Sequence, residues 1–313
     1  MFEIRRYSSE QQAAWNAFVA QSKNGTFLFD RRYMDYHQDR FQDHSLMVYL
    51  KGRLYALLPA NRVADKLISH QGLTYGGLVM GRQATTSHVV ELFRFLNIYL
   101  KEQGIRHVSY RPTPWIYHSM PAEEDLYAIV EACQARLTAR EVSTTFAFGN
   151  VQKWATLRTR CLKKARQKGL TAAWTDDLET FWPILTCNLQ HRYGLQPVHT
   201  IEEIRLLQQR FPDKIRLVAA FQEGRMVAGI VLYCSGQVVH SQYIAASEEG
   251  KQTGALDLII DFLQHDCSFE QPLFDFGKST EEHGDILNEG LIRQKEGFGG
   301  RAVCYDTYTW DIP

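Results

Sequence analysis

The sequence predicts an α+β protein in which one domain is written twice in tandem, each copy a mixed, mainly antiparallel sheet flanked by helices. Three observations indicate this. The chain has 313 residues, 45% of them hydrophobic, which is enough for two domains that each bury a core. Its second half reads as strand, helix, helix, three strands, helix, strand, helix, strand. Its first half gives the same order, and each copy has roughly 150 residues, a usual domain size.

In the second half, apolar runs between turn residues predict strands, and apolar residues at helical spacing predict helices. The turns Glu223-Gly224 and Ser235-Gly236 join the three central strands into an antiparallel meander. The predicted strands are Leu170–Trp174, Ile215–Phe221, Met226–Cys234, Val238–Ala246, Leu273–Phe276 and Ala302–Trp310. The predicted helices begin after Asp177 and at Thr200, and cover Ala255–Cys267 and Asp285–Glu296.

The first half repeats these elements, and its turn Lys51-Gly52-Arg53 corresponds to Glu223-Gly224-Arg225 in the second. The predicted strands are Phe2–Arg6, Leu46–Leu50, Leu54–Val63, Leu67–Leu78, Ile105–Tyr110 and Leu137–Phe148. The predicted helices are Glu10–Gln21, Arg31–Gln38, Ser87–Lys101 and Ala122–Ala135. We therefore expect an N-terminal domain over residues 1–149, a connecting segment over 150–169 and a C-terminal domain over 170–313.

Composition excludes several classes of protein. The 35 basic and 35 acidic residues balance, which argues against a general nucleic-acid-coating protein, because such proteins need excess cations to release phosphate counterions. No window is long and apolar enough for a membrane span, and the N-terminus lacks the apolar core of a signal peptide, so we expect a cytoplasmic protein. The six cysteines form no close pair and are expected to be reduced, small core residues.

Several short motifs, taken in order, resemble the FemAB-like branch of the GNAT superfamily of acyl and aminoacyl transferases, in which two GNAT domains stand in tandem. The motifs are Tyr75-Gly76-Gly77, Pro114-Trp115-Ile116-Tyr117-His118 with Pro121–Asp125, Phe274-Asp275-Phe276-Gly277, Leu287-Asn288-Glu289-Gly290-Leu291 and Lys295-Glu296-Gly297-Phe298-Gly299. The resemblance covers essentially the whole chain. It implies that the fourth and fifth strands of a domain splay apart and that the acyl donor enters the gap.

The resemblance also implies a donor-phosphate site at Gly250, Lys251 and Gly254, where a helix N-terminus and a cation would meet a pyrophosphate. The GNAT pattern Gln/Arg-x-x-Gly-x-Gly/Ala is matched only in part, since Leu256 takes the place of its last small residue. An ordinary strand-to-helix turn is the alternative. The co-substrate is expected to be either an acyl-coenzyme A or an aminoacyl-tRNA, with no permanently bound cofactor.

Three residues are candidates for catalysis. Lys295 matches the lysine of a FemAB-like Phe-Lys-x-x-Phe-Gly motif and could stabilise an oxyanion, although Gln294 replaces the preceding Phe. Asp275 and His240 are candidates for the proton transfer. The alternative for Lys295 is a lysine at the edge of an apolar helix face. For Asp275 it is a surface-facing aspartate or one that caps the loop at Ser279-Thr280, and for His240 it is a strand histidine that is merely hydrogen-bonded. The expected helix Asp285–Glu296 contains no tyrosine, which argues against a standard acetyltransferase mechanism.

The segment Val151–Lys168 carries seven cations and no acid, with apolar residues at helical spacing, and therefore predicts a basic amphipathic helix. Its Arg158 and Lys164 could hold phosphates of an acceptor, and Arg111 could contribute to the same anionic site. A solvated linker helix and a turn-stabilising arginine are the alternatives. Tyr243 and Asn288 complete the predicted substrate-binding set. The loop Glu281–Asp285 lacks the spacing of metal ligands, so no metal is expected.

These residues lead to two functional hypotheses. The first is an acyl or aminoacyl transferase that acts on an amine of a cell-envelope or polysaccharide precursor, with Lys295 at the oxyanion. The second is a non-catalytic GNAT-like binding module for a phosphate-bearing ligand. The sequence has no charged heptad stretch for the helical arm of many FemAB-type enzymes, which favours a small donor over tRNA. A third possibility, nucleic-acid binding through Val151–Lys168, predicts affinity that falls steeply with salt.

Overall fold

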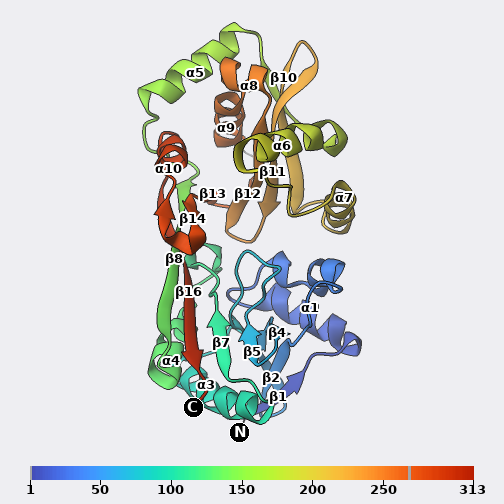
Figure 1. The fold of residues 1–313 in the computed structure, drawn as a ribbon, viewed down its shortest axis with the longest axis vertical. Coiled ribbons are helices and arrows are strands. Elements are labelled where there is room, and N and C mark those ends of the chain that lie inside the picture. The colour runs from blue at the N-terminus through green and yellow to red at the C-terminus, as the bar shows by residue number, and fades with distance from the viewer. Residues whose placement is uncertain (1, 267–268) are drawn as a thin grey trace. The chain divides into compact units, whose positions relative to one another are not determined.

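The computed structural model describes residues 2–266 and 269–313, which form two compact units (Figure 1). The first comprises residues 2–142, Thr280–Ile286 and Cys304–Pro313. The second comprises residues 143–266 and 269–279 together with Leu287–Val303. The chain passes between the two units more than once near its C-terminus, whereas the predicted division uses single boundaries at 149 and 169. Those boundaries stay a prediction.

The second unit contains a mixed sheet with the strand order β8-β13-β12-β11-β10-β9. Every neighbouring pair in this order is antiparallel except β12 and β13, which are parallel. The strands are β8 (Arg136–Ala147), which enters the unit at Ser143, β9 (Thr171–Thr175), β10 (Ile215–Gln222), β11 (Arg225–Cys234), β12 (Val238–Ala246) and β13 (Leu273–Lys278).

Helices cover both faces of this sheet. On one face, α9 packs against a core that includes Val218, Ile230 and Leu232. On the other, the Phe181 ring of α6 lies over Gly229, where a Cβ would come within 2.6 Å of the ring. The helices are α5 (Thr156–Gln167), α6 (Leu178–Tyr193), α7 (Ile201–Arg210), α8 (Glu248–Thr253), α9 (Ala255–His265) and α10 (Glu289–Glu296). The Thr200 hydroxyl caps α7, accepting a hydrogen bond from Glu203 N at 3.2 Å.

The first unit has a sheet of order β1-β2-β3-β6 and a second run, β4-β5-β7-β16. Its core joins these strands to α3 and α4. The strands are β1 (Phe2–Arg6), β2 (Leu46–Leu50), β3 (Arg53–Leu58), β4 (Asn61–Val63), β5 (Lys66–Ile68), β6 (Val79–Met80), β7 (His107–Tyr110) and β16 (Arg301–Asp311). The helices are α1 (Gln12–Gln21), α2 (Arg31–Met34), α3 (Thr86–Glu102) and α4 (Glu124–Cys133).

The predicted fold class is confirmed: both halves are mixed α/β, and the repeated element order is present in each. Short additions differ from the prediction. β14 (Thr280–Glu281) and β15 (Ile286–Leu287) form a two-stranded ribbon before α10, and α8 precedes α9. The segments predicted as helix over Asp285–Glu296 and Val151–Lys168 are shorter, since α10 begins after its cap Asn288 and α5 begins at Thr156.

Two predicted strands of the first half were wrong. The run Leu67–Leu78 holds only the three residues of β5, because the chain turns at His70, whose φ is +77°, and folds back so tightly that a Cβ at Gly76 would lie 1.8 Å from Ser69 O. Leu54–Val63 divides into β3 and β4 at Pro59. Likewise, Arg31–Gln38 is one α-helical turn followed by a 3₁₀ turn. The predicted end of the helix Ala255–Cys267 lies outside the described residues, and α9 ends at His265.

Candidate active site

The parallel strands β12 and β13 separate part of the way along their length. Their register runs from Val238 opposite Leu273 to His240 opposite Asp275 and ends there, although β12 continues to Ala246. Beyond this point β12 stays paired with β11, and β13 with β8. The β11–β12 ladder also shifts register at Gln242, as in a β-bulge, which bends a strand locally. This arrangement supports the expected gap between the two strands.

Asp275 lies at the point of separation and is completely buried. Its Oδ1 accepts hydrogen bonds from the Ser143 hydroxyl and, at 3.2 Å, from Thr145 Oγ1, both on β8. Gly277 N also donates to Oδ1, at 3.3 Å. A buried carboxylate needs such donors to offset its lost hydration. The alternative of a surface-facing aspartate is therefore excluded.

His240 faces Asp275 across the parallel pair. Its Nδ1 lies 2.8 Å from Asp275 Oδ2, and 12% of its side chain is exposed. When Nδ1 carries the hydrogen of this bond, the basic lone pair of the imidazole is on Nε2. The carboxylate thus fixes both the orientation and the tautomer of the ring, as the acid does in a Ser-His-Asp triad.

Lys295 brings a cation to the same cluster from α10. Its Nζ donates to the carbonyls of Gly277, at 2.8 Å, and Lys278, at 2.7 Å. The residue is buried, and this burial lowers its pKa from 10.5 to about 8 even though the charge of Asp275 raises it. An ammonium has three N–H groups, so one is left to donate to a developing negative charge.

Gly277 connects the three side chains. Its amide donates to Asp275, its carbonyl accepts from Lys295, and a Cβ on it would lie 3.3 Å from His240 Cε1. Its φ of +76° is one that side chains rarely adopt. The sequence motif Phe274-Asp275-Phe276-Gly277 is therefore a structural unit. It buries the carboxylate of Asp275 and places the Gly277 carbonyl where Lys295 can donate to it.

The predicted donor-phosphate residues line a pocket of about 480 Å³ beside α9. Gly250 and Lys251 belong to α8, where their amides are hydrogen-bonded to Ser247, and Gly254 caps the start of α9 in the left-handed conformation. Lys251 pairs with Glu248 at 2.6 Å. The segment is thus a helical turn and a cap rather than an open loop.

The start of α9 does not fit a pyrophosphate. Asp257 is buried in its first turn and its Oδ1 lies 3.2 Å from Arg158 Nη1, so a carboxylate already occupies the positive end of the helix. Burial raises the pKa of Asp257 to about 6, opposed by the Arg158 charge. The backbone of α5 also closes over Gly254, whose Cβ position is 2.4 Å from Cys161 O. Together with Leu256, these contacts argue against coenzyme A binding in the usual GNAT manner.

The predicted substrate-binding cations lie in different surroundings. Arg158 is partly buried between Asp257 and the Phe298 ring, while Lys164 is exposed on the same helix. Arg111 belongs to the first unit, where its Nη2 donates to His70 O at 2.5 Å and burial lowers its pKa. The stabilising role considered for Arg111 is thus supported by its contacts.

Tyr243 and Asn288 have structural partners as well. Tyr243 is buried, its hydroxyl lies 2.6 Å from His199 Nδ1, and burial raises its pKa to about 12. Asn288 is the N-cap of α10 and accepts a hydrogen bond from Leu291 N at 3.0 Å. The substrate roles of both residues stay predictions.

Sequence reasoning missed Ser143 and Thr145, because isolated hydroxyls on a strand carry no motif. Period-2 alternation does place both on one face of β8, but nothing in the sequence pairs that face with Asp275. It also missed Asp257, whose spacing of three residues after Gly254 was the available signal.

A parallel strand pair that opens within a mainly antiparallel sheet, in a chain that repeats the same element order, agrees with the tandem GNAT-like fold that the sequence predicts. Residues 155–284, which contain α5 to β13, match the family model described as the acetyltransferase (GNAT) domain. No curated protein matches the chain.

Solved structures show the same fold over nearly the whole chain. FemX has 11% identity and a TM-score of 0.68, with 97% of this chain and 96% of that chain covered. A domain named as the C-terminal part of a lysylphosphatidylglycerol synthetase from Agrobacterium fabrum has 13% identity and a TM-score of 0.60, covering 96% and 92%. A tandem GNAT protein of clavulanic acid biosynthesis has 11% identity and a TM-score of 0.54, covering 100% and 99%. At such identities the likeness shows the fold, while activity must be argued from the site.

Three further observations bear on the site's chemistry. Within residues 2–266 and 269–313, no three His, Cys, Asp or Glu side chains gather as metal ligands would. The cysteines of this part are free thiols, and the sixth, Cys267, lies outside it. No helix in the described ranges has the length and hydropathy that a membrane crossing requires.

Proposed function

We propose that the protein transfers an aminoacyl or acyl group from an activated ester to an amine, with the chemistry at His240, Asp275 and Lys295. The observation that carries the proposal is the convergence of these side chains where β12 and β13 separate. A base and a cation beside a gap between strands are what acyl transfer needs from a protein, in addition to positioning of the two substrates.

In the proposed reaction the amine nitrogen attacks the carbonyl carbon of the ester, forming a C–N bond and a tetrahedral oxyanion. His240 Nε2 accepts the proton that the amine loses, while Asp275 stabilises the imidazolium through Nδ1. Lys295 donates its third N–H to the oxyanion. Collapse breaks the C–O bond, and the imidazolium returns the proton to the leaving oxygen.

We further propose that the donor is an aminoacyl ester carried by RNA. Two observations support this choice over coenzyme A. Asp257 and the α5 backbone occupy the place where a GNAT domain binds a pyrophosphate. The fold is also shared with a lysylphosphatidylglycerol synthetase domain, whose name denotes lysyl transfer. These observations reverse the preference for a small donor that the missing helical arm suggested.

The acceptor in this proposal is an amine of a cell-envelope or polysaccharide precursor, such as a nucleotide-linked amino sugar or a peptidoglycan intermediate. This choice rests on the resemblance to the FemAB-like branch. The site itself requires only that the acceptor present an uncharged amine to His240.

A donor-by-acceptor panel tests the proposal. Labelled aminoacyl-tRNAs and acyl-coenzyme A thioesters are incubated with the purified protein and each class of amine, and amide products are detected by mass spectrometry. We expect product with an aminoacyl-tRNA and its loss in His240→Asn, while the matched control His265→Asn, an exposed histidine on α9, keeps full activity. No product from any donor would refute the proposal and favour the non-catalytic binding module, and product with coenzyme A thioesters alone would refute the choice of donor.

A further inference from the structure

Helix α5 presents a row of cations to solvent. Arg160, Lys163 and Lys164 are exposed on one side of the helix, with Lys153 just before it and Lys168 at its C-terminal cap. Arg160, Lys164 and Lys168 follow one another at intervals of about 6 Å along the axis. No acidic residue interrupts residues 151–168. The result is a narrow strip of positive charge on a chain whose net charge is zero.

The opposite side of α5 is fixed to α9. Arg158 pairs with Asp257, and Arg166 Nη2 lies 2.7 Å from Asp261 Oδ2. Ala165 is fully buried against the core of the second unit, and Trp154 Nε1 donates to Gln264 at 3.1 Å. These contacts hold the helix in place without help from the exposed cations.

The contacts that attach α5 to α9 therefore do not involve the exposed cations. Within residues 2–266 and 269–313, no ion pair or hydrogen bond engages the side chains of Lys153, Arg160, Lys163, Lys164 or Lys168. Five like charges on one strip repel one another, so a bound polyanion would relieve this repulsion and release its own counterions.

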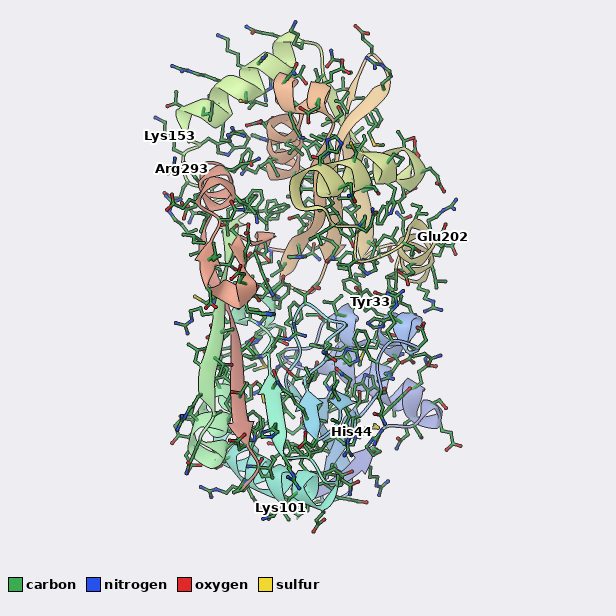
Figure 2. All side chains as sticks on the ribbon, in the orientation of Figure 1. Tyr33, His44, Lys101, Lys153, Glu202 and Arg293 are labelled. Atoms are coloured by element: carbon green, nitrogen blue, oxygen red, sulfur yellow. The ribbon has the colours of Figure 1, made fainter. Side chains whose placement is uncertain are left out.

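The strip leads to the helix that carries Lys295. Ala155 N, just before α5, donates to Gly297 O at 2.8 Å, and Arg293 and Gln294 of α10 line one pocket together with Arg158. Figure 2 shows Lys153 and Arg293 near one another at this end of α5. A long anion on the strip can thus approach the turn of α10 that also holds Lys295.

The apolar residues of α5 distinguish between two classes of polyanion. A helix that lies on a membrane keeps its apolar face free for lipid, whereas that face of α5 is packed against α9. The exposed side carries cations and one exposed leucine, Leu157, which lies in line with Lys164 two turns further along the helix. A rigid strip with positive charge and little apolar surface is complementary in charge to the repeated phosphates of a nucleic acid.

We propose that the exposed strip of Lys153, Arg160, Lys163, Lys164 and Lys168 binds the phosphate backbone of an RNA. This rests on the proposed function, in which the donor ester is carried by RNA. The strip holds the RNA through charge alone and reads no bases, and the RNA bound along it extends toward α10.

The test is RNA binding without chemistry, measured by fluorescence anisotropy with an RNA hairpin that ends in a single-stranded CCA. The α5 variant replaces Arg160, Lys163 and Lys164 with Gln. The matched control replaces three cations that are exposed on the first unit, Lys51, Arg53 and Lys101, also with Gln. Circular dichroism and thermal unfolding check that both variants fold.

We expect wild type and control to bind the hairpin with affinity that falls steeply with salt. The α5 variant should bind at least tenfold more weakly, and the slope of log affinity against log salt should decrease in magnitude by about 2–3 for three lost phosphate contacts. Equal affinity and slope in the two variants would overturn the proposal, as would binding to anionic phospholipid vesicles without binding to RNA. His240→Asn separates this test from the proposed function, because it should bind RNA normally while failing to transfer.

Discussion

His240 Nδ1 lies 2.8 Å from Asp275 Oδ2 at the last paired position of β12 and β13, immediately before the two strands separate. The pair therefore joins a fully buried carboxylate to an imidazole whose side chain is 12% exposed. Because burial removes the carboxylate from water, two hydroxyls and an amide supply hydrogen bonds in place of hydration.

Asp275→Asn should slow transfer far more than it weakens substrate binding. The amide cannot stabilise the imidazolium and can fix the wrong tautomer, so we expect kcat to fall by a factor of about 10²–10⁴ with little change in KM. Steady-state kinetics with the productive donor and acceptor would measure this. An unchanged kcat in a folded variant would remove Asp275 from the mechanism.

Activity should decline as pH rises above about 8. The pKa of Lys295 is lowered to about 8 by burial, so the ammonium that donates to the oxyanion is lost through this range. Lys295→Gln should lower kcat by about 10²–10³ at neutral pH and should lack this alkaline limb, whereas Lys101→Gln should match wild type. A pH–rate profile checks both, and an alkaline limb that persists in Lys295→Gln would assign it to another group.

The same lysine should affect stability at alkaline pH. Its folded-state pKa of about 8 is below the usual lysine pKa of 10.5, so between these values the unfolded chain binds more protons than the folded chain. The contribution of Lys295 to the free energy of unfolding therefore increases as pH rises through this window. Urea unfolding at several pH values should show this rise in wild type and its loss in Lys295→Met. The idea fails if the two proteins differ by the same amount at every pH.

Gly277→Ala should impair transfer although residue 277 carries no functional side chain. The φ of +76° is unfavourable for alanine by about 1–2 kcal/mol, and the new methyl group would press on His240 Cε1. We expect a lower kcat together with a lower Tm. Gly52→Ala is the control, because its φ of +75° gives the same backbone strain with no atom within 4 Å of the Cβ. Equal activity losses in both variants would mean that strain alone is responsible.

The first unit should lose stability as pH falls below 6.5. Burial lowers the pKa of His70 to about 3 and that of His44 to about 4, so the unfolded chain binds protons that the folded chain excludes. His70→Asn should reduce this acid sensitivity, since asparagine tolerates the φ of +77° better than most residues and does not titrate. Thermal unfolding between pH 7 and 4 measures the effect, and identical pH profiles for the two proteins would contradict it.

The sequence predicted the positions of helices and strands better than it predicted the contacts between residues that are distant in the chain. Alternation and turn residues located β10, β11 and β12 nearly to the residue, because local patterning determines a meander. The run Leu67–Leu78 was wrongly predicted as one strand, because its apolar residues pack in a glycine-rich loop whose path depends on the hydrogen bond from Leu78 N to the Tyr110 hydroxyl, 32 residues away. Similarly, motif resemblance identified Lys295 and Asp275, but the Ser143 contact that holds Asp275 comes from a strand some 130 residues earlier.

The most direct test of the account is a single-turnover experiment in which labelled aminoacyl-tRNA and an amine acceptor are mixed with excess protein. We expect the label to leave the RNA and to appear as an amide of the acceptor, at least 100-fold more slowly in His240→Asn and Lys295→Gln than in wild type, with His265→Asn and Lys101→Gln unaffected. If the label moves equally fast in the His240 and Lys295 variants, the cluster at the β12–β13 separation is not the transfer site.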